Sequence, residues 1–197
     1  MRYTKEHKSK TRERVLEAAG RQIRQCGVQG IALNGVMAAA GLTHGSFYAH
    51  FASKDDFLAE AVEQMFLDSP VSILRGDGKS AESALGEFVD YYLSPEHRDT
   101  RVSGCPLPFL AADAPRLNEN LRQRLSKGVA GMAALIAGHL SHVSHRGKGS
   151  VGEFASSVVS EIVGVIILAR VESDGIRSDV LLKSSRDQIR NRLGLSN

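Results

Sequence analysis

The chain has 197 residues, of which 42% are hydrophobic and 24% charged, enough to form the core of one globular domain or of two small ones. Its two cysteines cannot build a disulfide framework, and no Cys or His spacing is typical of a zinc site. The N-terminus is basic and lacks the apolar stretch of a signal peptide, and the longest apolar run, at residues 162–169, is too short to span a membrane. We therefore expect a cytoplasmic protein with no bound metal, no cofactor and no membrane partner.

The net charge of +3 is concentrated in the first third of the chain. Nine Lys or Arg residues stand against five Asp or Glu up to residue 57, whereas the remainder holds sixteen against seventeen. Six of the nine basic residues lie within the first fourteen positions. Such an excess favours binding to nucleic acid through counterion release, although the same residues could form a solvated tail.

The hydrophobic pattern predicts helices throughout, and no segment alternates like a strand. The first helix is predicted over residues 8–25, with an apolar stripe that includes Ile23 and Cys26, and it ends at Gly27. Two short helices are predicted next, over 33–40 and 44–50, with a turn at Gly41 between them.

The second short helix has a buried and an exposed side. Thr43 is a suitable N-cap, because its hydroxyl can accept a hydrogen bond from an amide of the first turn. Phe47 and Phe51 are four residues apart and can anchor the helix to a core, which leaves the polar residues between them facing outward. Two short helices joined by a glycine-containing turn are typical of a DNA-binding helix-turn-helix.

Six further helices follow, which brings the predicted total to nine. Ser53 caps a helix that ends before Pro70 and has Asp55 and Asp56 in its first turn, and Ser150 with Glu153 forms a capping box. The first of the six begins at Ser53, and the second runs from about Leu85 to Tyr92 and is closed by Ser94-Pro95. The third spans Pro106 to Asp113, and the fourth runs from Pro115 to Val143. The last two cover 150–173 and 176–193. We place the boundary between two domains at residues 52 and 53.

The run Gly41-Leu-Thr-His-Gly-Ser-Phe-Tyr-Ala-His-Phe51, followed by Ser53-Lys54, resembles the signature of the tetracycline-repressor (TetR/AcrR) family. The resemblance covers about the first third of the chain. It implies an all-α homodimer with a helix-turn-helix DNA-binding domain at 1–52, which contains three helices, and a helical ligand-binding and dimerisation domain at 53–197. It also implies repression of transcription at a double-stranded DNA operator of pseudo-palindromic sequence, with release when a small-molecule effector binds.

The candidate DNA-binding residues lie on and around the helix-turn-helix. Ser46 and His44 are near the helix start, where recognition helices touch base edges, and Tyr48 and Lys54 suit phosphate. The family usually has Thr or Ser at the cap of the first motif helix, where this chain has Ala32, and Asn34 could make the missing contact. The predicted set is Asn34, Thr43, His44, Gly45, Ser46, Tyr48, His50 and Lys54. Taken singly, each could be an ordinary surface residue.

The helix at 150–173 is apolar around most of its circumference, so it must be covered on all sides. We predict that one side faces its own core and the other a second copy of the chain, with the last helix completing the interface; a central helix in a monomer is the alternative. The predicted interface residues are Val158, Ile162, Val165, Ile166, Ala169, Leu182, Ile189 and Leu193.

A ligand cavity is predicted among the helices around 57–67, 84–93 and 117–143. Its candidate residues are Phe66, Phe88, Tyr92, Cys105, Phe109, Met132 and His139, each of which could instead be plain core. A thiol near a helix start, such as that of Cys105, can react with electrophiles, and this would make the protein a thiol-based sensor of oxidants or electrophiles. Because the sequence shows neither a basic neighbour nor a resolving cysteine beside Cys105, we prefer a non-covalent effector.

Two other classes of function remain open. An enzyme would need a nucleophile with its base, paired carboxylates or a phosphate-binding loop, and none stands out; a small thiol enzyme using Cys105 is the remaining case. A DNA-binding architectural protein would lack the ligand cavity. The sequence therefore favours a ligand-responsive transcriptional repressor over both.

Overall fold

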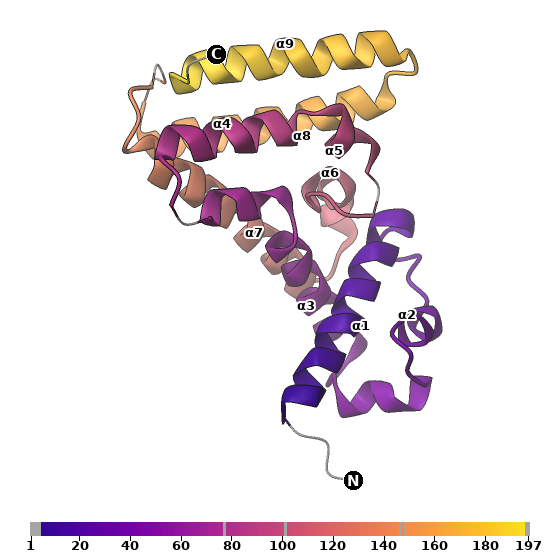
Figure 1. Ribbon diagram of the computed structural model, residues 1–197. Coiled ribbons are helices and arrows are strands. Elements are labelled where there is room, and N and C mark those ends of the chain that lie inside the picture. Colours follow the sequence, from indigo (N-terminus) through magenta and orange to yellow (C-terminus); the bar gives the residue numbers. More distant parts are fainter. Residues whose placement is uncertain (1–4, 77, 101, 146, 148, 196–197) are drawn as a thin grey trace. The chain divides into compact units, whose positions relative to one another are not determined.

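The computed structural model describes residues 5–76, 78–100, 102–145, 147 and 149–195 (Figure 1). Regular structure in this part of the chain is helical throughout and includes no strand, which confirms the predicted all-α class. The chain folds into two compact units. Residues 1–67 and 101–125 form the first unit, and residues 68–100 and 126–197 form the second.

The first unit contains the N-terminal helices and a segment distant in sequence. Helix α1 packs against α2 and α3, and a 3₁₀ helix, η1, follows α2. Its elements are α1 (Lys5–Cys26), α2 (Leu33–Ala39), η1 (His44–Ala49), α3 (Lys54–Leu67), α6 (Leu107–Leu110), η3 (Ala111–Arg116) and the start of α7 (Glu119–Leu140). Gly27 and Gly41 both have φ of 72°, a left-handed conformation that ends α1 and α2 where the sequence predicted.

The second unit is built on a helical hairpin. Helices α8 and α9 run side by side in opposite directions, and α4 packs against α9 and against the 3₁₀ helix η2 (Figure 1). The elements are η2 (Pro70–Arg75), α4 (Ala81–Tyr92), α5 (Pro95–Asp99), the rest of α7, α8 (Val151–Val171) and α9 (Gly175–Leu193). The predicted capping box at the start of α8 is confirmed, with both reciprocal hydrogen bonds between Ser150 and Glu153 present.

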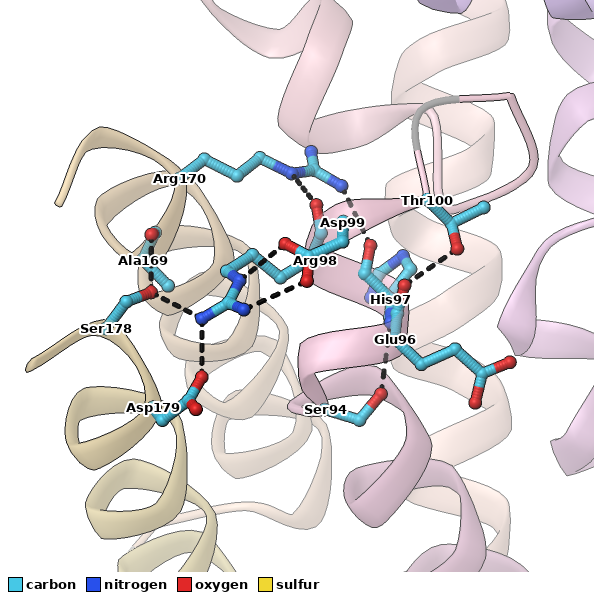
Figure 2. Close-up of polar contacts among 10 residues, drawn as sticks. All are labelled: Ser94, Glu96, His97, Arg98, Asp99, Thr100, Ala169, Arg170, Ser178 and Asp179. Atoms are coloured by element: carbon cyan, nitrogen blue, oxygen red, sulfur yellow. Dashed lines mark hydrogen bonds and ion pairs between the residues drawn. The ribbon is translucent and has the colours of Figure 1, made fainter. Parts of the chain in front are cut away.

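Two arginines connect α5 to the α8–α9 hairpin (Figure 2). Arg98 donates from Nη1 to the hydroxyl of Ser178 (2.8 Å) and pairs with Asp179 (2.6 Å). Arg170, near the end of α8, donates from Nε to the carbonyl of Arg98 (3.0 Å) and from Nη2 to that of His97 (3.1 Å). These contacts hold the short helix α5, which its own hydrogen bonds alone could not stabilise.

Several short elements differ from the sequence prediction. The helix expected at 44–50 is a 3₁₀ helix, and the one expected at 106–113 divides into α6 and η3. Pro115 lies inside η3 rather than at the first position of α7, which begins at Glu119. Ser94 and Pro95 follow α4 but also start α5, and η2 was not predicted. Segments of four to six residues are too short to show a helical period, so their prediction depends on tertiary contacts.

The predicted boundary at residues 52 and 53 does not coincide with the two units, because α3 and residues 101–125 pack with the N-terminal helices. As a division of function it stays a prediction. Helix α8 is the one helix in the described ranges that is long and apolar enough to cross a membrane, by length and composition only. Core helices pass the same test, and α8 buries Ile162 and Ile166 within the second unit.

Candidate DNA-reading surface

The segment η1 is held by a cluster of three aromatic residues. Phe47 is fully buried, and its ring lies 5.3 Å from that of Phe51 and 5.4 Å from that of Phe57, centroid to centroid. The rings of Phe51 and Phe57 are 4.8 Å apart in an edge-on arrangement. Aromatic pairs at these separations stabilise beyond simple burial, so this cluster can fix a short helix that has few hydrogen bonds of its own.

The other side of η1 faces solvent. The side chains of His44 and Tyr48 are exposed, Tyr48 to 71%, and Gly45 between them leaves the backbone uncovered. Ser46 is half-buried, and its hydroxyl donates to the carbonyl of Thr43 at 2.7 Å. Thr43 occupies the N-cap position as predicted, but its hydroxyl makes no capping hydrogen bond. This side presents donors and acceptors that a base edge or a phosphate could use.

Arg12 of α1 connects three elements at the end of this surface. Its Nε donates to the carbonyl of His50 at 3.4 Å, its guanidinium lies 4.8 Å from the ring centroid of Phe51, and it forms an ion pair with Glu60 of α3. The sequence reading counted Arg12 with the basic tail and missed this role, because its partners lie far along the chain. A side chain so placed holds the C-terminal end of η1 against α1.

His50 is half-buried, and its Nδ1 atom has no hydrogen-bond partner among the described residues. The pKa of His50 is lowered, first by desolvation on burial and then by the positive charges of Lys8 and Arg12. Both effects favour the neutral imidazole over the imidazolium. At the reading surface it can act through a hydrogen bond rather than through charge.

The remaining predicted DNA residues flank η1. Asn34 is exposed in the first turn of α2, behind Ala32, which supplies no side-chain cap. Lys54 is exposed at the first position of α3, and Ser53 accepts a hydrogen bond from the amide of Asp56 at 3.0 Å, as its predicted role as a cap requires. All eight predicted DNA-binding residues therefore lie in the first unit, and all are exposed or half-exposed.

The predicted ligand residues are divided between the units. Phe66, Cys105 and Phe109 belong to the first unit, and Phe88, Tyr92, Met132 and His139 to the second. In the second unit the rings of Phe88 and Tyr92 pack 5.4 Å apart and are fully buried, while Nε2 of His139 is hydrogen-bonded to the carbonyl of Leu74 at 2.8 Å. The convergence of all seven residues on one cavity stays a prediction.

An open groove of about 750 Å³ lies on the second unit between α4 and α9, and none of the predicted ligand residues lines it. An ion pair between Arg190 and Asp90 (2.7 Å) lies in this groove, which also contains Tyr91. Ligand pockets for small molecules are usually more enclosed and more apolar than this. Among the described residues no group of three or more His, Cys, Asp or Glu side chains could hold a metal ion.

The two cysteines have opposite environments. Cys105 is fully buried, whereas Cys26 is exposed at the end of α1, which corrects our assignment of Cys26 to the packed stripe. The thiol of Cys26 donates to the carbonyl of Gln22 at 3.0 Å. Nε of Arg24, a residue distant in the sequence, donates to the carbonyl of Gly104, the residue before Cys105. Whether Cys105 reacts stays a prediction.

The residues predicted for a dimer interface are buried within a single chain. Val165 is the most exposed of the eight at 8%, and Ile162, Ile166, Ile189 and Leu193 are fully buried. Their burial within one chain leaves them little surface for contact with a second copy. The same two helices leave other apolar side chains exposed, namely Leu168, Val171, Ile176 and Val180.

Comparisons with known proteins agree with this architecture. Residues 15–61 match the family model for bacterial regulatory proteins of the tetR family, and residues 81–185 match that for the tetracyclin repressor-like C-terminal domain. An uncharacterized HTH-type transcriptional regulator in the lacX 3′ region of Lactococcus lactis subsp. lactis is 24% identical over 167 residues, which is 83% of this chain and 85% of that protein.

The HTH-type transcriptional repressor NemR of Escherichia coli K12 is 28% identical over 131 residues, 64% of this chain and 65% of NemR. The crystal structure of the reduced form of E. coli NemR aligns with a TM-score of 0.77 at 22% identity, over 92% of this chain and 96% of that one. This structural likeness confirms the fold, with an N-terminal helix-turn-helix domain followed by a helical C-terminal domain.

Proposed function

Because the chain belongs to the tetracycline-repressor family of bacterial transcription regulators, we propose that it is a cytoplasmic repressor that binds a pseudo-palindromic operator as a homodimer and responds to a small-molecule effector. The observation that carries the proposal is the exposed side of η1, where His44, Ser46 and Tyr48 stand on a rigid aromatic cluster. A reading element must present its side chains without rearrangement, and buried aromatic packing provides that rigidity.

The roles within the surface follow from position and chemistry. His44 and Ser46 are at the start of η1, where side chains of a recognition helix reach base edges in the major groove. Tyr48 and Lys54 suit phosphate oxygens, and Lys54 also sits at the N-terminal end of α3, where the helix dipole favours an anion. The excess of basic residues before residue 57 supplies the attraction that does not depend on base sequence.

Support for a homodimer comes from apolar side chains that one chain leaves in water. Leu168, Val171, Ile176 and Val180 are between 58% and 79% exposed, and they lie around the turn from α8 to α9. Exposed apolar groups on neighbouring helices are typical of interaction surfaces, and a two-fold axis would let these residues meet their copies. We therefore move the proposed interface from the buried residues of the two helices to this exposed set.

A non-covalent effector remains the proposed stimulus. The complete burial of Cys105 supports this, since an electrophile could reach the thiol only after the segment opens. The guanidinium of Arg24 next to Gly104 is the observation that keeps a thiol sensor as a second candidate. Release of DNA by a thiol electrophile from the wild type, and not from Cys105→Ser, would assign the response to the thiol.

The DNA-binding proposal is tested with a duplex that the protein selects from a random-sequence library. His44→Ala and Ser46→Ala should each change the preferred base at a defined position of the half-site. Lys54→Ala should instead weaken binding to every sequence and lower the slope of log affinity against log salt by about one. Affinities are measured by fluorescence anisotropy at several salt concentrations. Unchanged affinity and preference in all three variants would refute the assignment of this surface.

A further inference from the structure

Arg24 is a buried cation that joins α1 to two other segments of the first unit. Its side chain and backbone together are only 7% exposed. Nε donates to the carbonyl of Gly104 at 3.0 Å, Nη1 to that of Val102 at 3.5 Å, and Nη2 to that of Met65 near the end of α3 at 3.3 Å. Gly104 and Val102 are about 80 residues away in the chain and lead directly to Cys105.

The local sequence makes room for this guanidinium. A Cβ atom at position 20, one turn before Arg24, would lie 3.0 Å from Cγ of Met65 and 3.2 Å from Nη1 of Arg24. Glycine at this position therefore allows the charged group to lie flat against α1. A buried cation is tolerated only when its donors are satisfied, because losing an acceptor leaves a desolvated donor without a partner. The position of the carbonyls at 102 and 104 is thus tied energetically to that of α1.

The same helix also contacts the candidate reading surface, through Arg12. Arg12 holds the carbonyl of His50 and the ring of Phe51, twelve residues before Arg24, a distance of about 18 Å along a helix. Helix α1 is continuous from Lys5 to Cys26 and contains both arginines, so it can carry a displacement at Arg24 to Arg12. We propose that Arg24 is a positioning residue that couples the segment 102–105 to the DNA-reading surface through α1.

This inference rests on the proposed function, since it concerns the regulation of DNA binding. An effector or modification that moves the carbonyls of Val102 and Gly104 therefore also changes the contacts that Arg12 makes at the end of η1. Coupling between two sites is reciprocal. Binding of DNA by η1 must therefore alter the segment that carries Cys105, and this consequence can be measured without knowing the effector.

The experiment uses Cys26→Ser as background, which leaves Cys105 as the single cysteine of the chain. N-ethylmaleimide is the probe, the extent of labelling at Cys105 is followed by mass spectrometry, and the duplex is the one selected from the random library. We expect saturating duplex to slow the labelling of Cys105 at least about fivefold in the background protein, which is the lower end of typical coupling between sites. In Arg24→Met the labelling rate should be higher and should no longer depend on DNA.

A matched control separates coupling from general loss of stability. Arg170 makes the same kind of contact, two hydrogen bonds from its guanidinium to backbone carbonyls, but in the second unit (Figure 2). Arg170→Met should lower the Tm while the DNA still slows labelling of Cys105. Gly20→Ala keeps the cation but crowds it, so DNA should still slow the labelling of Cys105, but by less than in the background protein. This variant replaces Arg24→Met in the test if Arg24→Met does not fold.

The possible outcomes are distinct. If the background protein selects a duplex but DNA does not change the labelling of Cys105, or if the change persists in Arg24→Met and Gly20→Ala, the coupling through Arg24 is wrong while the proposed function stands. If the background protein binds no duplex, the proposed function fails and the coupling fails with it. Loss of the DNA effect in Arg24→Met and its partial reduction in Gly20→Ala, together with its full retention in Arg170→Met, supports the proposal.

Discussion

His50 ends the reading segment, and it is the residue there whose ionisation the fold changes. Its Nδ1 is buried without a hydrogen-bond partner in the described structure, and two basic residues of α1, Lys8 and Arg12, act on it. All three influences disfavour the imidazolium. At the scale of single residues, the reading surface is therefore built from side chains that are partly withdrawn from water as well as from those that are fully exposed.

This environment predicts how stability depends on pH. Because folding lowers the pKa of His50, the unfolded chain binds a proton at a higher pH than the native chain, so the residue reduces stability as pH falls through its unfolded value of about 6.5. We expect His50→Gln to lose less of its Tm than the wild type between about pH 8 and about pH 5. Lys8→Gln should show an intermediate loss, because it removes one of the charges. Equal loss in all three proteins would contradict the argument.

At the scale of elements, the long helices begin and end at residues that act locally. The hydroxyl of Ser150 accepts a hydrogen bond from the amide of Glu153 at 3.3 Å, and the carboxylate of Glu153 accepts one from the amide of Ser150 at 2.9 Å. The hydrogen bonds that the backbone amide and then the hydroxyl of Ser150 donate to the carboxylate lower the pKa of Glu153. The short elements differ, since η1 and α5 depend on side chains from other helices.

The cap of α8 gives a direct test of this distinction. Ser150→Ala should lower the free energy of unfolding by about 1 kcal/mol, the usual cost of losing an N-cap. Ser156→Ala is the matched control on the same helix: its exposed hydroxyl donates back to the carbonyl of Gly152, so removing it should leave stability unchanged or slightly increased. Urea unfolding followed by circular dichroism measures both. A Ser150→Ala protein as stable as Ser156→Ala would show that the cap contributes nothing.

At the scale of the whole molecule, the exposed apolar side chains around the α8–α9 turn decide the proposed assembly. Leu168, Val171, Ile176 and Val180 would remain in water in a monomer. Ile166, which the sequence analysis placed in the dimer interface, is fully buried in its own chain. A charge there would unfold the protein rather than separate two copies. The informative substitutions are therefore at exposed positions.

We expect Val171→Asp to convert a homodimer to a folded monomer, because it would place a charge within an apolar interface. Val129→Asp is the control, since Val129 of α7 is also an exposed valine, at 41%, outside the proposed patch. Sedimentation velocity gives the mass, and circular dichroism confirms that each variant is folded. The proposed patch would be refuted by a wild type that sediments as a monomer at micromolar concentration, or by a Val171→Asp protein that remains dimeric.

The sequence by itself determined the all-α class, the helix-turn-helix with its anchors Phe47 and Phe51, the cap at Ser53 and the capping box at Ser150. Each of these depends on residues three or four positions apart, and such local patterns are legible in a linear chain. The resemblance to a known family extended the prediction to DNA binding, because the surface of η1 lies within one continuous run of residues.

Only the tertiary structure decided which side chains join distant segments. Arg12 and Arg24 donate to carbonyls 38 to 80 residues away, whereas the sequence shows them only as basic residues. In retrospect Leu16, Gly20 and Arg24 form a second buried row on α1, but a charge in such a row does not reveal its partners. The apolar pattern of α8 likewise could not separate core from interface. Hydrophobicity predicts that a side chain leaves water, but it does not predict which surface covers it. That surface depends on contacts made across the fold.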